Sequence, residues 1–388
     1  MKRIPILLAV LAMALTGAAT AVAAPDTSVD TVDYDLGDAA FTVPNSPLPV
    51  ELMGEVYYPH HLGAGKHPLV MLVHGLFATC ADATGKASYG WPCPAGSGQL
   101  HSERGYRDMG RELASHGYVV VSISSNGING QPSTDSARDR ATLMNKHLEL
   151  WRQLSASGTG PLAGHFVDPK SNTPRAVDFT DRVDMNNVGT MGHSRGGAAV
   201  ILQASDKERG SVPNGVTIKA VVALEPATIY TPDGSTGNFI TSIPYAVVLG
   251  TCDWDTGTAG SELLHTTVKH TAPVQGYLVH GANHTFYNTT WSNGPGSFDD
   301  ADKYMRDNLP KDKPLPAPGN CYTNDGKYSQ ERQLTQVQQH EVGKTYLGAF
   351  FRRYLGGETQ FDPVLSGASE PLRDLTKVDV LPLTESKQ

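Results

Sequence analysis

Residues 187–200 read NVGTMGHSRGGAAV, and this stretch decides how the rest of the chain is interpreted. The run up to Met191 is typical of a short buried strand, and a helix of small residues is expected over Arg195–Ala204. Between them the sequence matches G-x-S-x-G, in which glycines at both ends permit a very tight turn. Ser194 would then hold a strained backbone conformation above the helix N-terminus, with its hydroxyl raised at the carboxyl end of the strand. The alternative is a glycine-rich turn that contains a serine by chance.

A serine hydroxyl becomes a nucleophile only with a base beside it and an acid that orients the base. Asp253 follows the apolar run Tyr245–Leu249. We expect it to be the acid, with Asp255 as the reserve choice. His284 follows the next apolar run, Val274–His280, and is the expected base. His280 is the rival base, but its place at the end of a strand favours a structural role. The order Ser194, Asp253, His284, each after a strand, matches one of the chain orders known for serine hydrolases.

Donors for a developing oxyanion are expected from two backbone amides. The apolar run that precedes His74 leads into His74-Gly75-Leu76, where the glycine lets the chain turn inward. The amide of Leu76 would be one donor, and the amide of Arg195, directly after the serine, would be the other. His74 itself is expected to hold this loop in place.

Aromatic side chains cluster near the expected acid, base and oxyanion loop. They could form an apolar wall for the acyl or alcohol part of a substrate, or they could simply pack the loops. These residues are Phe77, Trp254, Phe286, Tyr287 and Trp291.

Short apolar runs alternate with amphipathic segments along most of the chain, which predicts an α/β fold with a mostly parallel sheet and helices on both faces. The expected strands are Glu51–Tyr58, Pro68–Val73, Tyr118–Ile123, Asn187–Met191, Thr217–Leu224, Tyr245–Leu249 and Val274–His280. The expected helices are Glu103–His116, Ser136–Leu154, Arg195–Ala204 and Gln333–Leu355. Two long loops, Gly158–Asp178 and Phe286–Gln330, interrupt this alternation and are candidates for lids or substrate-binding walls.

Composition and charge exclude several classes of protein. The chain has 388 residues, 39% of them hydrophobic, so neither a disordered chain nor a small disulfide scaffold fits. Its formal net charge is −8, and no run rich in lysine and arginine stands out, so a nucleic-acid partner is not expected.

The chain begins with the pattern of a secretory signal peptide. Lys2 and Arg3 precede an apolar stretch, and Ala21-Val22-Ala23 offers small residues for cleavage, so residues 1–24 are expected to be removed. An uncleaved membrane anchor is the alternative. A catalytic domain would then span residues 25–357, with an insertion at about 286–330, followed by a tail at 358–388 packed on the surface.

Export makes the four cysteines candidates for disulfides, although four cysteines allow three pairings. A local bridge between Cys80 and Cys93 is the simplest choice, and it leaves Cys252 to pair with Cys321. A metal site is the competing explanation, but there is no C-x-x-C motif and no cysteine has a histidine at the spacing of a zinc site.

From about Glu51 to Leu355 the sequence resembles the α/β-hydrolase superfamily. Residues 192–197, GHSRGG, are similar to the lipase box of chlorophyllases, and residues 70–76, VMLVHGL, to the oxyanion segment of platelet-activating-factor acetylhydrolases. Residues 114–120, ASHGYVV, are similar to a segment that both groups share with secreted bacterial polyester hydrolases of the dienelactone type. Residues 125–129, SNGIN, and 281–288, GANHTFYN, are similar to segments of secreted bacterial hydrolases.

The resemblance implies an α/β-hydrolase fold and a carboxylic-ester hydrolase of the esterase or lipase type that needs no cofactor. Arg195 departs from the polyester hydrolases, which usually carry a smaller or apolar residue there, and this argues against a role in degrading plastic or cutin. We therefore expect a secreted monomer, extracellular or periplasmic and without a membrane span after signal removal, that cleaves small-molecule or lipid-like esters through an acyl-enzyme. The alternatives are a serine peptidase or amidase of the same fold, and a non-catalytic binding protein that uses it.

Overall fold

The computed structural model describes residues 28–227, 239–266, 268–293 and 301–385. The signal peptide and cleavage site expected within residues 1–24 lie outside these ranges. Within the described ranges, no helix combines the length and the apolar character needed to cross a membrane.

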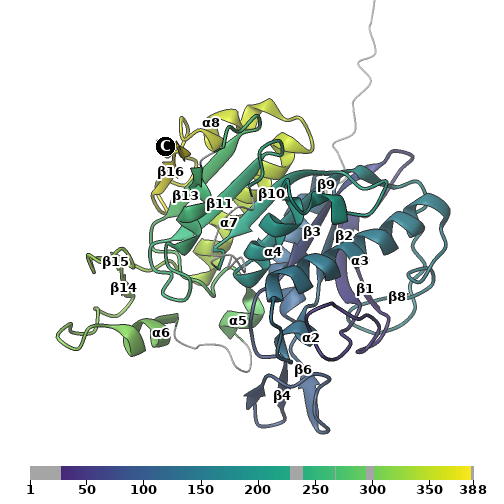
Figure 1. Cartoon of the computed structure of the whole chain (residues 1–388), viewed down its shortest axis with the longest axis horizontal. Helices are drawn as coiled ribbons and strands as arrows, with labels where there is room; N and C mark the ends of the chain where they lie inside the picture. The colour runs from purple at the N-terminus through teal and green to yellow at the C-terminus, as the bar shows by residue number, and fades with distance from the viewer. Residues whose placement is uncertain (1–27, 228–238, 267, 294–300, 386–388) are drawn as a thin grey trace, which may run out of the picture.

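A ten-stranded mixed sheet forms the centre of the molecule (Figure 1). All neighbouring strands from β13 to β7 run parallel, whereas the strands added at both edges are antiparallel. The central strands consist of buried apolar residues with little polar alternation, as expected when both faces are covered. In spatial order the strands are β16 (Val378–Leu381), β13 (Val274–Val279), β11 (Tyr245–Gly250), β10 (Ile218–Leu224), β9 (Val183–His193), β3 (His67–Val73), β7 (Val119–Ile123), β2 (Met53–Pro59), β1 (Val29–Asp35) and β8 (Phe166–Val167).

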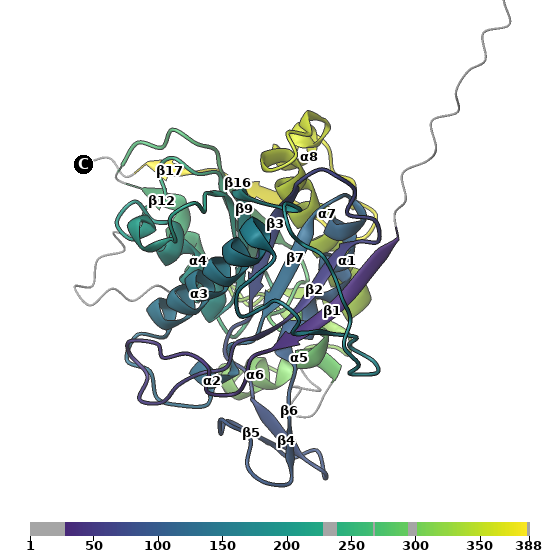
Figure 2. The ribbon, with the colours of Figure 1, turned by 90° about the vertical axis from the view of Figure 1, so that its right-hand side faces the viewer.

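Two pairs of helices cover the two faces of this sheet (Figure 2). Helices α3 (Ser136–Ser157) and α4 (Arg195–Ala204) bury one apolar cluster, and α1 (Arg107–Ser115) and α7 (Gln336–Tyr354) bury the other. Local sequence sets the ends of the longer helices, since the Asp135 side chain caps α3 and Thr335 forms a capping box with Gln338 at the start of α7. The α/β class, with a mostly parallel sheet between helices, is therefore confirmed.

Smaller elements surround this core. The remaining helices are α2 (Asn126–Asn129), α5 (Thr289–Asn293), α6 (Ala301–Asn308) and α8 (Asp362–Leu365), and 3₁₀ turns occupy Ser102–Tyr106, Arg209–Ser211, Ala259–Leu264 and Thr359–Phe361. Three small sheets comprise β4 (Cys80–Asp82) with β5 (Ala87–Ser88) and β6 (Ser97–Gln99), β14 (Asn320–Tyr322) with β15 (Gln330–Arg332), and β12 (His265–Thr266) with β17 (Thr384–Glu385).

Both expected disulfides are confirmed. Cys80 pairs with Cys93 beside the small β4–β5–β6 sheet, and Cys252 pairs with Cys321 across 69 residues of sequence. Strands β1, β8 and β16 were not expected from the sequence, and β8 lies within the loop expected at Gly158–Asp178. Strand β16 comes from the expected surface tail, and it extends the main sheet beside β13.

Candidate active site

Ser194 occupies the sharp turn between β9 and α4. Its backbone has φ 58° and ψ −123°, a conformation that residues with a Cβ rarely adopt. Close packing requires glycine on both sides of this turn. A Cβ on Gly192 would lie 1.9 Å from the carbonyl oxygen of Gly196, and a Cβ on Gly196 would lie 2.5 Å from the carbonyl oxygen of Val73. The strand-to-helix turn expected from G-x-S-x-G is therefore formed, with Ser194 at its tip.

The loop after β3 lies directly against the serine. A Cβ on Gly75 would lie 2.5 Å from Ser194 Cβ and 2.9 Å from Ser194 Oγ, so only glycine fits there. Among the described residues, the amides of Leu76 and Arg195 donate no hydrogen bond to the protein. Two amides without a partner beside a serine hydroxyl are what an oxyanion site requires.

His74 holds this loop, as expected from the sequence. Its ring is fully buried, and burial lowers the pKa of His74 to about 4, so the imidazole is neutral. The amide of Ser125 donates to His74 Nε2 at 2.8 Å, which places the ring proton on Nδ1, 2.9 Å from the carbonyl oxygen of Gly75. Asn129 Nδ2 and Arg140 Nε donate to the carbonyl oxygens of Gly75 and His74. With the carbonyls of the loop fixed in this way, its amides keep a constant direction.

His284 and Asp253 form a buried pair close to His193, the residue before the serine. His284 Nδ1 donates to Asp253 Oδ2 at 3.0 Å, and both side chains are almost wholly buried. Asp253 also accepts from the amides of Asp255 and Thr256 and from Thr256 Oγ1. Burial alone would raise the pKa of Asp253, but His284 and these donors outweigh it and keep that pKa below its ordinary value. The same attraction raises the pKa of His284 despite burial.

Asp255, the reserve acid, lies near the opposite nitrogen of the imidazole. Its Oδ2 is 3.7 Å from His284 Nε2, and about half of its side chain is exposed. Because Asp253 engages Nδ1, it is the carboxylate placed to fix the tautomer of the ring and leave Nε2 free to accept a proton.

The base lies beside the nucleophile turn. The ring centroid of His284 is 4.9 Å from that of His193, the residue before Ser194. In the described residues no hydrogen bond joins Ser194 Oγ to His284. Such bonds are often long in unliganded sites and shorten when substrate binds. His280, the rival base, pairs instead with Glu331 and Asp379, so it has a structural role.

The His284 loop is anchored by a residue that was not predicted from the sequence. Gln339 on α7 is fully buried, and its amide group accepts from the amide of Asn283 at 3.0 Å and donates to its carbonyl oxygen at 2.6 Å. The side chain of Asn283 accepts from the amides of Thr285 and Phe286, so the turn around His284 is closed on itself. A glutamine inside an amphipathic helix carries no sequence signal for this role unless the helix is known to face the loop.

The Asp253 loop is anchored by a disulfide and by the segment at 320–324. Cys252, which pairs with Cys321, directly precedes Asp253. Asn324 Nδ2 donates to the carbonyl oxygen of Asp253 at 2.6 Å, and Trp254 Nε1 donates to that of Tyr322 at 2.7 Å. The position of the acid thus depends on a segment about 70 residues further along the chain.

The expected aromatic wall divides into two groups. Phe77, Tyr287 and Trp291 are buried, whereas Trp254 and Phe286 are partly exposed. Trp291 stacks on Phe77 and on the ring of His193, with centroids 5.5 and 4.5 Å apart. The buried group therefore packs the loops around the site from within, whereas the rings of Trp254 and Phe286 are accessible to solvent.

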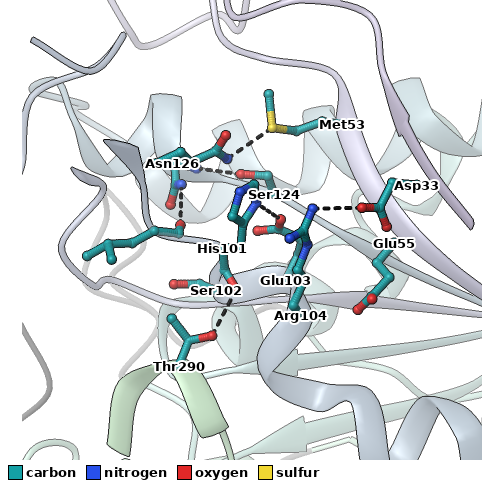
Figure 3. Close-up of polar contacts among 12 residues, drawn as sticks. Asp33, Met53, Glu55, His101, Ser102, Glu103, Arg104, Ser124, Asn126 and Thr290 are labelled. Carbon is teal, nitrogen blue, oxygen red and sulfur yellow. Dashed lines mark hydrogen bonds and ion pairs between the residues drawn. The ribbon is translucent and has the colours of Figure 1, made fainter. Parts of the chain in front are cut away.

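Trp291 is itself held by the segment at 100–104, which Figure 3 shows in close-up. Trp291 Nε1 donates to Ser102 Oγ at 3.0 Å, and Thr290 Oγ1 donates to the carbonyl oxygen of His101 at 2.9 Å. The segment is fixed in turn by Arg104, which pairs with Asp33 on β1 at 2.7 Å. Helix α5, which follows the His284 loop, is thereby tied to β1, the strand next to the edge strand β8.

Glu225 is a second residue that was not predicted from the sequence. It follows β10 and is fully buried, and its Oε2 lies 3.6 Å from His284 Nδ1 and 3.8 Å from His193 Nε2. Its position in the sequence could have indicated this place, because a carboxyl group directly after a parallel strand lies at the same sheet edge as Ser194 and Asp253.

The closest approach to a metal-binding arrangement in the described residues is made by His193, Glu225 and His284, whose ligand atoms lie within 4.8 Å of one another. His284 Nδ1 is already bonded to Asp253, so a metal ion there would break the bond that orients the imidazole. No metal site is assigned to these residues.

No protein-family model matches the chain, and no curated protein matches it. Function is therefore inferred from the geometry of the side chains and from the chemistry that this geometry permits.

Proposed function

We propose that the protein is a serine hydrolase of the α/β-hydrolase fold that cleaves carboxylic esters, with Ser194 as nucleophile, His284 as base and Asp253 as acid. The observation that carries the proposal is the strained turn at Ser194, accompanied by two unpartnered amides and by a buried imidazole–carboxylate pair close to His193. These are the parts that acyl transfer to a serine requires.

In the first step His284 Nε2 takes the proton of Ser194 Oγ while Oγ forms a bond to the carbonyl carbon of the ester. Negative charge moves to the carbonyl oxygen, where the amides of Leu76 and Arg195 donate hydrogen bonds. Each such donor contributes about 10²–10³ to kcat in comparable sites. The carbon–oxygen bond to the alcohol then breaks, and the imidazolium gives its proton to the departing oxygen.

In the second step water replaces the alcohol. His284 removes a proton from the water, and the resulting hydroxide attacks the acyl carbon. The second tetrahedral intermediate collapses, and Ser194 Oγ leaves with the proton from His284. Asp253 keeps Nδ1 protonated throughout and stabilises the transient imidazolium. The products are the carboxylic acid and the regenerated serine.

We also propose that the protein works outside the cytosol. Disulfides persist mainly in oxidising compartments, and the described part of the chain contains two. The residues expected to form a signal peptide would supply the route of export.

A fluorophosphonate probe tests the nucleophile even while the substrate is unidentified, because it reacts covalently with activated serines. We expect one adduct, located at Ser194 by peptide mass spectrometry, and none on Ser194→Ala. The matched control is Ser157→Ala, which removes an exposed serine at the end of α3. A series of p-nitrophenyl esters then measures hydrolysis and acyl-chain preference. Labelling at another serine, or full activity in Ser194→Ala, would refute the proposal.

A further inference from the structure

Glu225 is a buried carboxylic acid that the mechanism above does not use. It follows β10 with φ +40°, a strained value for a residue with a side chain, and it is completely buried. Neither of its carboxyl oxygens has a hydrogen-bond partner among the described residues. The pocket around it is closely fitted, since a Cβ on Gly250 would lie 2.4 Å from Glu225 Oε1. Burying an unsatisfied acid is costly, so its retention calls for a functional reason.

The backbone around Glu225 is joined to the nucleophile turn. The amide of Ser194 donates to the carbonyl oxygen of Leu224, and the amide of Ala227 donates to that of Ser194, both at 3.0 Å. Thr256 Oγ1, which donates to Asp253 at 2.7 Å, also lies 3.2 Å from the carbonyl oxygen of Glu225. The carboxyl group is therefore held in register with both the nucleophile and the acid.

Asp253 and Glu225 approach the same nitrogen of the base. His284 Nδ1 is 3.0 Å from Asp253 Oδ2 and 3.6 Å from Glu225 Oε2. Three donors besides His284 bond to Asp253, whereas Glu225 receives none. Hydrogen-bond donors stabilise a carboxylate, so Asp253 carries the negative charge and Glu225 keeps its proton.

The surrounding charges support this division. Burial and the negative charges of Asp253 and Asp255 raise the pKa of Glu225 well above its ordinary value. The other titratable groups that face it are His193 on β9, which burial keeps neutral, and His284 and Tyr287 on the loop after β13.

We propose that Glu225 is a positioning residue for His284, a second acid that stays protonated while Asp253 is charged and takes over Nδ1 when Asp253 cannot. This inference rests on the proposed hydrolase function. It gives the site a second carboxyl group directly after β10, the strand beside β9, in addition to Asp253, which follows β11.

A double-mutant cycle tests the proposal. Asp253→Asn in a site with a single acid costs about 10⁴ in kcat, but here we expect a loss of about 10² or less, because Glu225 can ionise and accept from Nδ1. Glu225→Gln, which mimics the protonated acid, should stay within about threefold of the wild type. The double variant should lose about 10⁴, far more than the two single losses combined. The matched control, Asp253→Asn with Glu55→Gln, alters a buried carboxyl group of β2 and should behave as Asp253→Asn alone.

The pH dependence supplies a readout that a merely structural role would not change. In Asp253→Asn, the rise of kcat with pH should occur at higher pH than in the wild type, because Glu225 must first lose its proton. In the double variant this rise should be absent. Unfolding curves monitored by circular dichroism show whether each variant is folded, and Glu225→Asp offers a shorter acid if Glu225→Gln does not fold.

The outcomes separate this inference from the proposed function. An inert wild type, unlabelled at Ser194, refutes the hydrolase proposal itself. An active wild type whose double variant equals Asp253→Asn shows that Glu225 does not support the base. A Glu225→Gln variant as impaired as Asp253→Asn shows that Glu225 is the ionised principal acid and overturns its assignment as a protonated reserve.

Discussion

One part of the candidate site, the oxyanion side, is made of backbone, and the other part, the acid–base side, is made of side chains. The oxyanion side depends on Gly75, Gly192 and Gly196, where any added Cβ would meet another atom within 2.5 Å. The acid–base side depends on the Asp253–His284 pair, which is held by side-chain hydrogen bonds and a disulfide.

This difference predicts different tolerance to change. Close-packed backbone has no alternative arrangement, so a single methyl group on the oxyanion side displaces the reacting atoms. The acid–base side spreads its support over several bonds, each of which contributes a limited amount to the orientation of the imidazole. Substitutions there should have graded effects.

Among single substitutions outside Ser194, the largest effect is expected from Gly75→Ala. The new methyl group would lie 2.5 Å from Ser194 Cβ and 2.8 Å from the carbonyl oxygen of His193, so either the serine or the oxyanion loop must move. We expect kcat to fall by at least about 10², which is the contribution of one oxyanion donor. Gly98→Ala is the control, because no atom lies within 4 Å of the position of its Cβ. An active Gly75→Ala would show that the backbone side is not rigid.

Removal of the two disulfides should separate stability from activity. On the chain-entropy model, the Cys252–Cys321 bridge contributes about 4 kcal/mol to the free energy of unfolding and the Cys80–Cys93 bridge about 3 kcal/mol. The two variants in which both cysteines of one bridge are replaced by serine should therefore lose thermal stability. Only the loss of Cys252–Cys321 should also lower kcat, by about tenfold, because that bridge adjoins Asp253. Equal kcat in the two variants at a temperature where both are folded would contradict this assignment.

The smallest effect is expected from Asp255→Asn. His284 acts as a base only when it is neutral, so kcat/KM should rise with pH through a pKa above 6.5. Burial lowers that pKa, Asp253 more than reverses the effect, and Asp255 raises the pKa further. Removing the charge of Asp255 should therefore move the rise of kcat/KM to lower pH. Asp374→Asn, which alters a fully exposed side chain, is the control. A rise of kcat/KM that moved to higher pH in Asp255→Asn would contradict the prediction.

The elements predicted most accurately from the sequence have a strong local pattern. Helix α4 begins and ends where the sequence placed it, at Arg195 and Ala204, because a glycine turn and a run of small apolar residues define it. Strand β16 was missed because it is short and acquires its order by pairing with a distant strand at the edge of the sheet. Strand β1 was missed although it has seven residues, because it lacks a continuous apolar run and is ordered by pairing with β2. Pairing of this kind leaves little mark on the local sequence.

The candidate site follows the same rule. Ser194, Asp253 and His284 could be proposed because each follows a recognisable strand, and parallel strands bring their carboxyl ends to one edge. Gln339 could not, because its contacts depend on how α7 faces the loop around His284. Glu225 also follows a recognisable strand, so its place at this edge could be predicted, but its approach to His284 Nδ1 could not. The sequence pattern indicates which residues lie at the same edge of the sheet. Which side chains contact those residues is decided by tertiary packing.

The anchoring of the His284 loop by α7 has a consequence for biosynthesis. Ribosomes release the chain from its N-terminus, so β9 and Ser194 emerge well before Cys321 and Gln339. A nascent or prematurely terminated chain that lacks these residues carries the serine and its oxyanion loop but not the bonds that restrain the imidazole and its carboxylate. Under the proposed function, hydrolytic competence would thus be acquired only after nearly the whole chain has been made and, because the bridge needs an oxidising compartment, after export.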